Sequence, residues 1–144
     1  MMRTVLVAWM SVTVALAGCG GADTAVGPEE MAPVNVTLGL YSGVPDPSWT
    51  LTDGEAAALT NALDELPRTE STAPEGGLGY HGFTIARPSG TLVAYAGMVS
   101  SSLSDPPYTL DDPDRTIERL LIETARAHVT PDEYAIVAEV VGQQ

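Results

Sequence analysis

The sequence predicts an α+β fold: a small, mostly antiparallel sheet of about three or four strands, covered by two or three helices. Three observations support this prediction. Apolar and polar residues alternate over residues 34–40, as in a half-buried strand. The turn sequence Pro88-Ser89-Gly90 separates two further strand-like runs. Apolar positions from Ile117 to His128 recur at helical spacing, which indicates an amphipathic helix.

The N-terminal residues predict a secretory signal followed by a tether. Arg3 precedes an apolar run, Val5–Ala17, that is shorter than the roughly 20 residues of a membrane-spanning helix. We therefore expect residues 1–18 to be a signal peptide. Residues 19–33 are small, polar and contain Gly and Pro, which favours a flexible tether. Residues 34–144 are then a single α+β domain.

The first half of the domain predicts a strand, a loop and a helix. The strand covers residues 34–40, and residues 41–47 are a loop because one Gly and two Pro interrupt regular structure. Thr52-Asp53-Gly54-Glu55 has the spacing of a capping box, which starts a helix that Pro67 ends. Residues 68–79 show no period and predict a second loop.

The second half begins with a predicted hairpin. Residues 83–87 and 91–99 are its two strands. Residues 100–112 are polar and contain Pro106-Pro107, so we expect a loop there, with a short strand near residues 108–110 as an option.

Two helices are expected at the C-terminal end. Pro113 suits the first position of a helix that Asp111 or Asp112 caps, and the apolar stripe of this helix reaches a partly buried His128. Thr130-Pro131-Asp132-Glu133 is again typical of a helix start. The β-branched residues in 134–141 leave a terminal strand as the alternative for this last segment.

The apolar run ends in Leu16-Ala17-Gly18-Cys19, which resembles the lipobox of bacterial lipoproteins. The resemblance implies cleavage before Cys19 and acylation of that cysteine, for example with palmitate. Cys19 is the only cysteine in the sequence. The expected location is therefore the extracytoplasmic side of a membrane, to which the lipid on Cys19 attaches the chain.

The charge of the chain argues against nucleic acid as a partner. Removal of the signal peptide and Arg3 would change the formal net charge from −13 to −14. The chain then has five arginines and no lysine against 19 acidic residues. Nucleic acids and anionic lipid headgroups require basic patches, which such a composition does not favour.

The segment Tyr41-Ser42-Gly43-Val44-Pro45-Asp46-Pro47-Ser48-Trp49 is the candidate binding loop. It resembles the Y-S-G-x-P-D/N-P-x-W motif of a family of uncharacterised bacterial proteins, which implies a shared fold and no particular activity. A rigid loop with Tyr41 and Trp49 around Asp46, and Pro45 at its turn, suits recognition of a partner. The alternative is that Trp49 packs into the core beside the first helix while Asp46 accepts hydrogen bonds from loop amides.

The sequence contains few candidates for catalytic or metal chemistry. His81 and His128 are its only histidines, and neither has an identifiable catalytic partner. We predict no catalytic site, no cofactor and no metal site. Four aspartates in and after the Pro-rich loop could favour calcium, although EF-hand spacing is missing; they are Asp105, Asp111, Asp112 and Asp114.

We expect the chain to be a lipid-anchored extracytoplasmic lipoprotein whose domain is a non-catalytic binding module, with an envelope protein as its partner. One alternative is a small extracytoplasmic hydrolase or carbohydrate-acting enzyme whose carboxylates the sequence does not identify. A further alternative is a calcium-stabilised structural lipoprotein.

Overall fold

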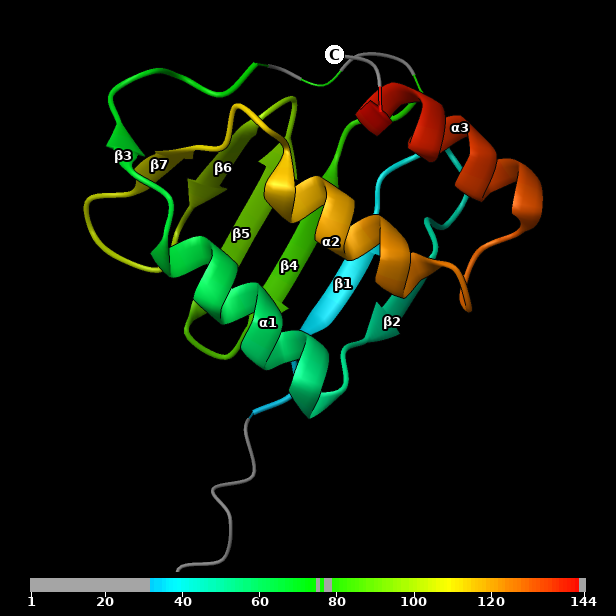
Figure 1. Cartoon of the computed structure of the whole chain (residues 1–144), viewed down its shortest axis with the longest axis horizontal. Helices are drawn as coiled ribbons and strands as arrows, with labels where there is room; N and C mark the ends of the chain where they lie inside the picture. Colours follow the sequence, from blue (N-terminus) through cyan, green and yellow to red (C-terminus); the bar gives the residue numbers. More distant parts are fainter. Residues whose placement is uncertain (1–31, 75, 77–78, 143–144) are drawn as a thin grey trace, which may run out of the picture. The chain divides into compact units, whose positions relative to one another are not determined.

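The computed structural model describes residues 32–74, 76 and 79–142, and all of these belong to one compact unit. The expected signal peptide, Cys19 and nearly all of the tether lie outside the described residues. The fold class is α+β, as the sequence predicts (Figure 1). In chain order the elements are β1 (Asn35–Leu38), β2 (Ser48–Thr50), α1 (Asp53–Asp64), β3 (Arg68–Thr69), β4 (Phe83–Arg87), β5 (Gly90–Tyr95), β6 (Met98–Ser101), β7 (Tyr108–Asp111), α2 (Thr116–Ala125) and α3 (Pro131–Gly142).

The sheet is larger than predicted. It has seven strands in the order β2-β1-β4-β5-β6-β7-β3, and all neighbours are antiparallel. The expected number of about three or four is therefore wrong, although the antiparallel arrangement is correct. β2 and β3 are only three and two residues long. Such short strands show no alternation in the sequence, because pairing with a neighbour alone defines them.

The predicted strand over residues 91–99 is in fact two strands joined by a tight turn. Tyr95 pairs with Met98, and Ala96 and Gly97 between them have φ angles of 53° and 80°. Two consecutive positive φ values are the signature of a type I′ hairpin turn, whose twist matches that of the flanking strands. Alanine is uncommon at this position, which explains why the sequence pattern did not indicate a turn.

All three helices lie on the same side of the sheet (Figure 1). The strand residues that point toward them are buried and form the core with apolar residues of the helices. Examples with no exposed surface are Val36, Leu38, Leu59, Phe83, Ile85, Val99, Ile117, Leu121 and Val137. None of the described helices is long and apolar enough to cross a membrane.

The start of α1 is the predicted capping box. The Glu55 amide donates to the Thr52 hydroxyl at 3.3 Å, and the Thr52 amide donates to the Glu55 carboxylate at 2.8 Å. α1 then extends to Asp64. The capping signal is local in the sequence, so it could be recognised without knowledge of the fold.

α2 begins three residues later than Pro113, the predicted first position. Its N-cap residue, Arg115, has a left-handed backbone with φ of 52° and supplies no side-chain cap. Asp112 caps the helix instead, because its two carboxylate oxygens accept from the amides of Thr116 and Ile117 at 2.8 and 2.9 Å. Asp112 is one of the two residues predicted to cap this helix. It lies four residues before Thr116, the first residue of α2, rather than directly before the helix.

The last element is a helix, so the alternative of a terminal strand is wrong. Thr130 and Glu133 exchange capping hydrogen bonds at its start, and Val137 and Val141 are buried against the core. β-branched residues favour strands over helices, but the burial of Val137 and Val141 on one face of α3 outweighs this preference. α2 ends at Ala125, so His128 lies beyond the helix and is exposed rather than partly buried.

Candidate functional site

Asp46 holds the predicted binding loop in place. One of its carboxylate oxygens accepts from the backbone amides of Leu40 and Tyr41, each at 2.9 Å. This is the arrangement expected if Asp46 orders the loop. Gly43, with φ of 93°, allows the chain to turn. Pro45 is exposed at the loop, so the backbone is fixed while its tip faces solvent.

Trp49 lies in the core and leaves only 6% of its surface exposed. Its indole nitrogen donates to the Thr124 hydroxyl at 3.1 Å. Its ring stacks on the His128 imidazole, with centroids 5.6 Å apart and planes within 3°, and meets the edge of Phe83. Trp49 thus fixes β2 to the C-terminal end of α2, and its ring is not part of the exposed surface of the loop.

Tyr41 is the exposed aromatic residue of the loop, with 40% of its surface accessible. Its hydroxyl donates to the Glu133 carboxylate in the first turn of α3. This hydrogen bond raises the pKa of Tyr41 and lowers the pKa of Glu133, and the Thr130 capping bond lowers the latter further. The loop therefore contacts α3 through one exposed hydrogen bond.

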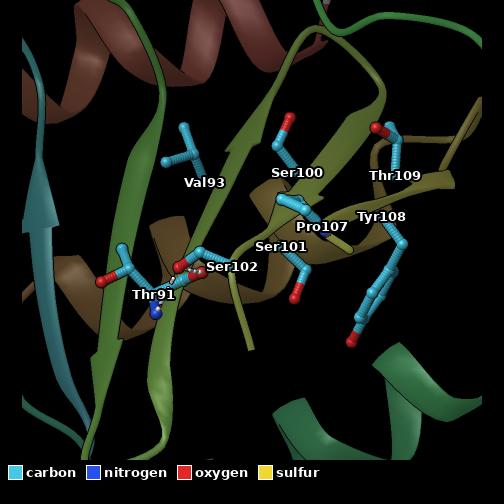
Figure 2. Close-up of a pocket in the computed structure, with 8 residues that line it drawn as sticks. All are labelled: Thr91, Val93, Ser100, Ser101, Ser102, Pro107, Tyr108 and Thr109. Carbon is cyan, nitrogen blue, oxygen red and sulfur yellow. Dashed lines mark hydrogen bonds between the residues drawn. The ribbon is translucent and has the colours of Figure 1, made fainter. Parts of the chain in front are cut away.

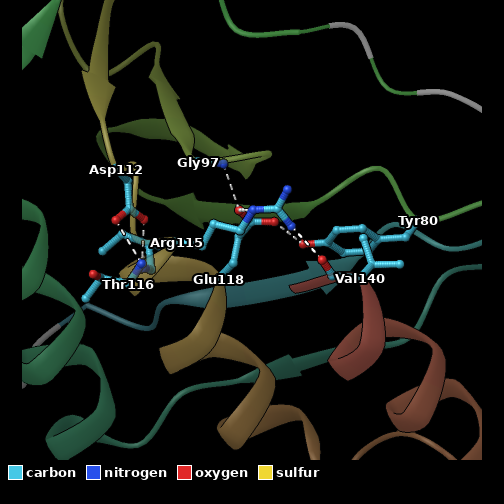
Figure 3. Close-up of polar contacts among 8 residues, drawn as sticks. Tyr80, Gly97, Asp112, Arg115, Thr116, Glu118 and Val140 are labelled. Carbon is cyan, nitrogen blue, oxygen red and sulfur yellow. Dashed lines mark hydrogen bonds and ion pairs between the residues drawn. The ribbon is translucent and has the colours of Figure 1, made fainter. Parts of the chain in front are cut away.

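A buried carboxylate, that of Glu118 in α2, connects three parts of the fold (Figure 3). One oxygen accepts from the Tyr80 hydroxyl at 2.6 Å, and the other accepts from the Gly97 amide at 3.0 Å. Arg115 lies 3.9 Å from the second oxygen, and its guanidinium donates to the carbonyl of Val140 in α3 at 2.7 Å. Burial is the main reason why the pKa of Tyr80 is well above its usual range.

These contacts give Glu118 a structural role. Nothing in the sequence pattern singles out Glu118, because its position on the helix matches an ordinary polar site. The positive-φ turn at Gly97 exposes an amide that no strand partner takes, and Glu118 accepts from it. Removal of the Glu118 carboxylate would lower the free energy of unfolding, since the Tyr80 hydroxyl and the Gly97 amide would each lose a buried acceptor.

The two histidines have structural contacts. The His81 imidazole shares a hydrogen bond with the Gly79 carbonyl at 2.8 Å, and its ring occupies the space that a Cβ at Gly39 would need. His128 stacks on Trp49. Within the part of the chain that the structure describes, neither of these contacts is with a residue that could serve as a nucleophile.

The four aspartates considered for calcium have separate environments. Asp112 is buried and caps α2, whereas the others are exposed. Within the described part of the chain, no three acidic, histidine or cysteine side chains are grouped so that they could hold a metal ion.

The face of the sheet opposite the helices carries a row of hydroxyl groups. The strand pairing places one residue of each strand in line across the whole sheet: Ser48, Thr37, Thr84, Val93, Ser100, Thr109 and Thr69. All except Val93 have a hydroxyl. Neighbouring positions are about 4.8 Å apart, as in any sheet. We call these seven residues the hydroxyl row.

A shallow cavity of about 360 Å³ lies at the β5–β7 part of the open face. Its lining is Thr91, Val93, Ser100, Ser101, Ser102, Pro107, Tyr108 and Thr109, drawn in Figure 2. Thr91 and Ser102 bridge β5 and the end of β6, because the Thr91 amide donates to the Ser102 hydroxyl at 3.1 Å and that hydroxyl donates back to the Thr91 carbonyl at 3.0 Å. The cavity contains no ionisable carboxylate or base in its lining.

The open face is also poor in charge. Among the described strand residues that alternate onto it, Asp111 at the end of β7 is the charged one. The whole chain, in contrast, has 19 acidic residues. In the sequence, this face corresponds to the polar residues that alternate with apolar ones along each strand. Only the strand order, which the sequence pattern does not give, brings these polar residues side by side.

Comparison with known proteins identifies no relative: no family, curated protein or solved structure matches this chain.

Proposed function

We propose that this chain is a lipid-anchored extracytoplasmic lipoprotein whose α+β domain is a non-catalytic binding module of the cell envelope. The anchor is inferred from the apolar run Val5–Ala17 and the lipobox-like segment that ends in Cys19. A tether of about 14 residues after the cysteine would reach roughly 20 Å as a random coil, which leaves the domain free to orient toward a partner.

The observation that carries the binding role is the open face with its hydroxyl row. A soluble protein surface is usually about a quarter to a third charged, whereas the core of a protein interface is depleted of charge. This face has Asp111 at one end and hydroxyl, amide or apolar side chains elsewhere on its strands. A partner can therefore cover it without removing an unpaired charge from water.

The partner we infer is an exported protein of the envelope. Its contact area should be uncharged, to match the hydroxyl row, and its surroundings should be basic, because the rest of this chain is strongly acidic. The exposed loop around Tyr41 and Pro45 contacts α3 through the Tyr41 hydroxyl and leads into Ser48, the first residue of the hydroxyl row. We do not assign this loop to the interface.

The anchor is tested by the chemical state of the N-terminus. Protein isolated from membranes should begin at an acylated Cys19, as measured by mass spectrometry and labelling with palmitate. Cys19→Ala should abolish the label and should leave the chain uncleaved. An unmodified Met1 at the N-terminus of membrane-derived wild-type protein would refute the anchor.

The open face is tested by charge placed at its centre. Thr84→Glu adds a carboxylate to the hydroxyl row, and Asn61→Glu, on the exposed surface of α1, is the matched control. Cross-linking in intact cells should recover a specific protein with the wild type and with Asn61→Glu, but not with Thr84→Glu. Both variants should have wild-type circular dichroism.

Two results would contradict this assignment. Equal cross-linking of Thr84→Glu and Asn61→Glu would exclude the open face as the interface. Recovery of a glycan in place of a protein would refute the protein partner and favour a carbohydrate-binding role for the same face.

A further inference from the structure

The middle of the open face is apolar. β5 is the fourth of the seven strands, with three on either side, and Val93 is the residue that it contributes to the hydroxyl row. The side chain leaves 37% of its surface exposed. Among the exposed large apolar side chains of the described residues, Val93 is the one that lies on a strand. The row therefore has an apolar group at its centre and hydroxyl groups on both sides.

The fold does not require a valine at this position. Val93 points away from the helices, and its partners across the sheet, Thr84 and Ser100, both carry hydroxyl groups. Threonine has nearly the same shape as valine and is equally suited to a strand. A threonine would thus continue the row without loss to the sheet. The valine therefore points to a contact with something outside the chain.

Val93 also lines the cavity of about 360 Å³ on this face, which we call the Val93 cavity (Figure 2). Figure 2 shows Val93 and Thr109 on opposite sides of Ser100, as the strand order β5-β6-β7 requires. The exposed Pro107, whose ring is rigid, adds a second apolar wall. The accessible part of the lining is mostly apolar, with hydroxyl-bearing residues around it. Such a cavity suits an aliphatic side chain.

The neighbouring cavity has a different character. Its volume is about 580 Å³, and it shares Pro107, Tyr108 and Thr109 with the Val93 cavity. The rest of its lining is polar: Arg68, Thr69, Glu70, Ser71 and Thr72. Of this pair, the Val93 cavity is the apolar one, so an aliphatic group on a partner would lie there.

Negative charge lies beside the Val93 cavity. Asp111 is two residues after Thr109 on β7, and alternation places both on the same face. Glu70 lines the neighbouring cavity. Both carboxylates are exposed, whereas the one guanidinium of that lining, Arg68, lies over the Tyr108 ring, 4.2 Å from its centroid. Two carboxylates against one guanidinium favour a cation next to the aliphatic group.

We propose that the Val93 cavity receives an aliphatic side chain of the protein partner, and that a lysine or arginine next to this side chain meets Glu70 and Asp111. Contacts that carry most of the binding energy lie near the centre of an interface, in apolar pockets surrounded by groups that exclude water. Val93 has that central position, and the hydroxyl row supplies the surrounding groups. The inference rests on the proposed function, because it names what the partner places on the open face.

The first test exchanges a methyl group and a hydroxyl group at the same shape. Val93→Thr completes the hydroxyl row, and it should lower recovery of the cross-linked partner from intact cells about tenfold, because it removes apolar contact and buries a hydroxyl. Thr84→Val is the reverse exchange at the neighbouring position of the row, outside the cavity, and should leave recovery unchanged. Both variants keep a β-branched residue, so both should have the wild-type urea midpoint.

The outcomes separate this inference from the proposed function. Unchanged or higher recovery with Val93→Thr, while Thr84→Glu still abolishes it, would refute the Val93 cavity as the central contact and leave the open face as the interface. Equal losses in Val93→Thr and Thr84→Val would mean that the whole row, and not the cavity, determines binding. If the wild type recovers no protein, the proposed function fails and this inference fails with it.

A double-mutant cycle tests the chemistry of the occupant. A photoreactive benzoylphenylalanine in place of Thr91, which lines the cavity, identifies the partner residues that lie there by mass spectrometry. Changing the aliphatic residue found there to alanine should weaken binding to the wild type about tenfold and have little further effect on Val93→Thr. Equal weakening with both proteins, or attachment to a segment without an aliphatic residue, would overturn the proposal.

The charges have their own test. Glu70→Gln combined with Asp111→Asn should lower recovery of the partner several-fold and make it less sensitive to salt. Asp64→Asn combined with Glu65→Gln removes the same charge from exposed positions at the end of α1 that line neither cavity, and it should leave recovery unchanged. Equal effects of the two pairs would refute a role for Glu70 and Asp111 and assign the effect to net charge.

Discussion

Ala96 has a Cβ in a backbone region that glycine and asparagine prefer. Its φ of 53° is the first position of the β5–β6 turn, and Gly97 follows. Ala96→Asn creates the Asn-Gly pair favoured in type I′ turns and should raise the free energy of unfolding by about 0.5–1 kcal/mol. Urea denaturation measures the change.

The control for this variant is Ala86→Asn, on an exposed strand position of β4 with an ordinary extended backbone. It should not stabilise the protein, because asparagine is disfavoured in strands. A lower free energy of unfolding for Ala96→Asn would show that the turn does not strain the alanine.

The hydrogen bond between Tyr41 and Glu133 should be visible in the titration of Glu133. The pKa of this carboxyl lies below its ordinary value of 4.5, first because of the Tyr41 hydroxyl and then because of Thr130. The bond thus stabilises the fold above pH 4.5 and is lost as the pH falls through the lowered pKa. Because the pKa of Tyr41 is raised above its ordinary value of 10, the contribution of this contact is fully present below pH 10 and is lost as the pH rises further, through the raised pKa.

Tyr41→Phe should move the pKa of Glu133 upward, as measured by NMR titration of the carboxyl carbon. The pKa of Glu55 is lowered by its capping bonds with Thr52, and it should be unchanged in this variant. A Glu133 pKa that does not move would mean that the Tyr41 contact is not populated in solution.

At the scale of single elements, α2 depends on a cap that lies outside it. Asp112 is 1% exposed and accepts from the first two amides of the helix. Asp112→Ala should lower the free energy of unfolding by about 1–3 kcal/mol, because it leaves two N-terminal amides without a partner.

The neighbouring Asp111→Ala and Asp114→Ala are matched controls, since both side chains are exposed. Each should change the free energy of unfolding by less than about 0.5 kcal/mol. If all three variants were equivalent, the acidic composition of the segment and not the Asp112 cap would determine the stability of α2.

The elements predicted correctly are those whose signal is local. The Thr52–Glu55 and Thr130–Glu133 boxes start α1 and α3 because a hydroxyl and a carboxylate three residues apart serve each other across one helical turn. β2 and β3 were missed because their few residues become strands only through pairing with β1 and β7. The Ala96-Gly97 turn was missed because alanine rarely has a positive φ.

The residues of the candidate sites show the same distinction. The role of Asp46 as the acceptor of loop amides was one of two options, and it follows from neighbours within six positions. The burial of Trp49 depends on Thr124, 75 positions away. The hydroxyl row depends on strand order, which no local pattern specifies.

At the scale of the whole molecule, the excess of acidic groups should lower the free energy of unfolding by a measurable amount. The formal net charge is −13, and repulsion among like charges destabilises a compact chain. Raising NaCl from 10 mM to 0.5 M shortens the Debye length from about 30 Å to below 10 Å. The urea midpoint at pH 7 should therefore rise with salt.

The control is the same comparison near the isoelectric point of about 4.1, where the net charge is small and the midpoint should depend much less on NaCl. A midpoint that falls with salt at pH 7 would mean that the attraction in pairs such as Arg126–Glu123 outweighs the general repulsion.

The two edge strands limit how copies of this domain can associate. β2 and β3 border the sheet and are three and two residues long, so each edge offers few free backbone groups. An open edge is where foreign strands add to a sheet and where aggregation begins. Copies brought together at high local density, as on a shared membrane, would thus have little template for extending one sheet into the next.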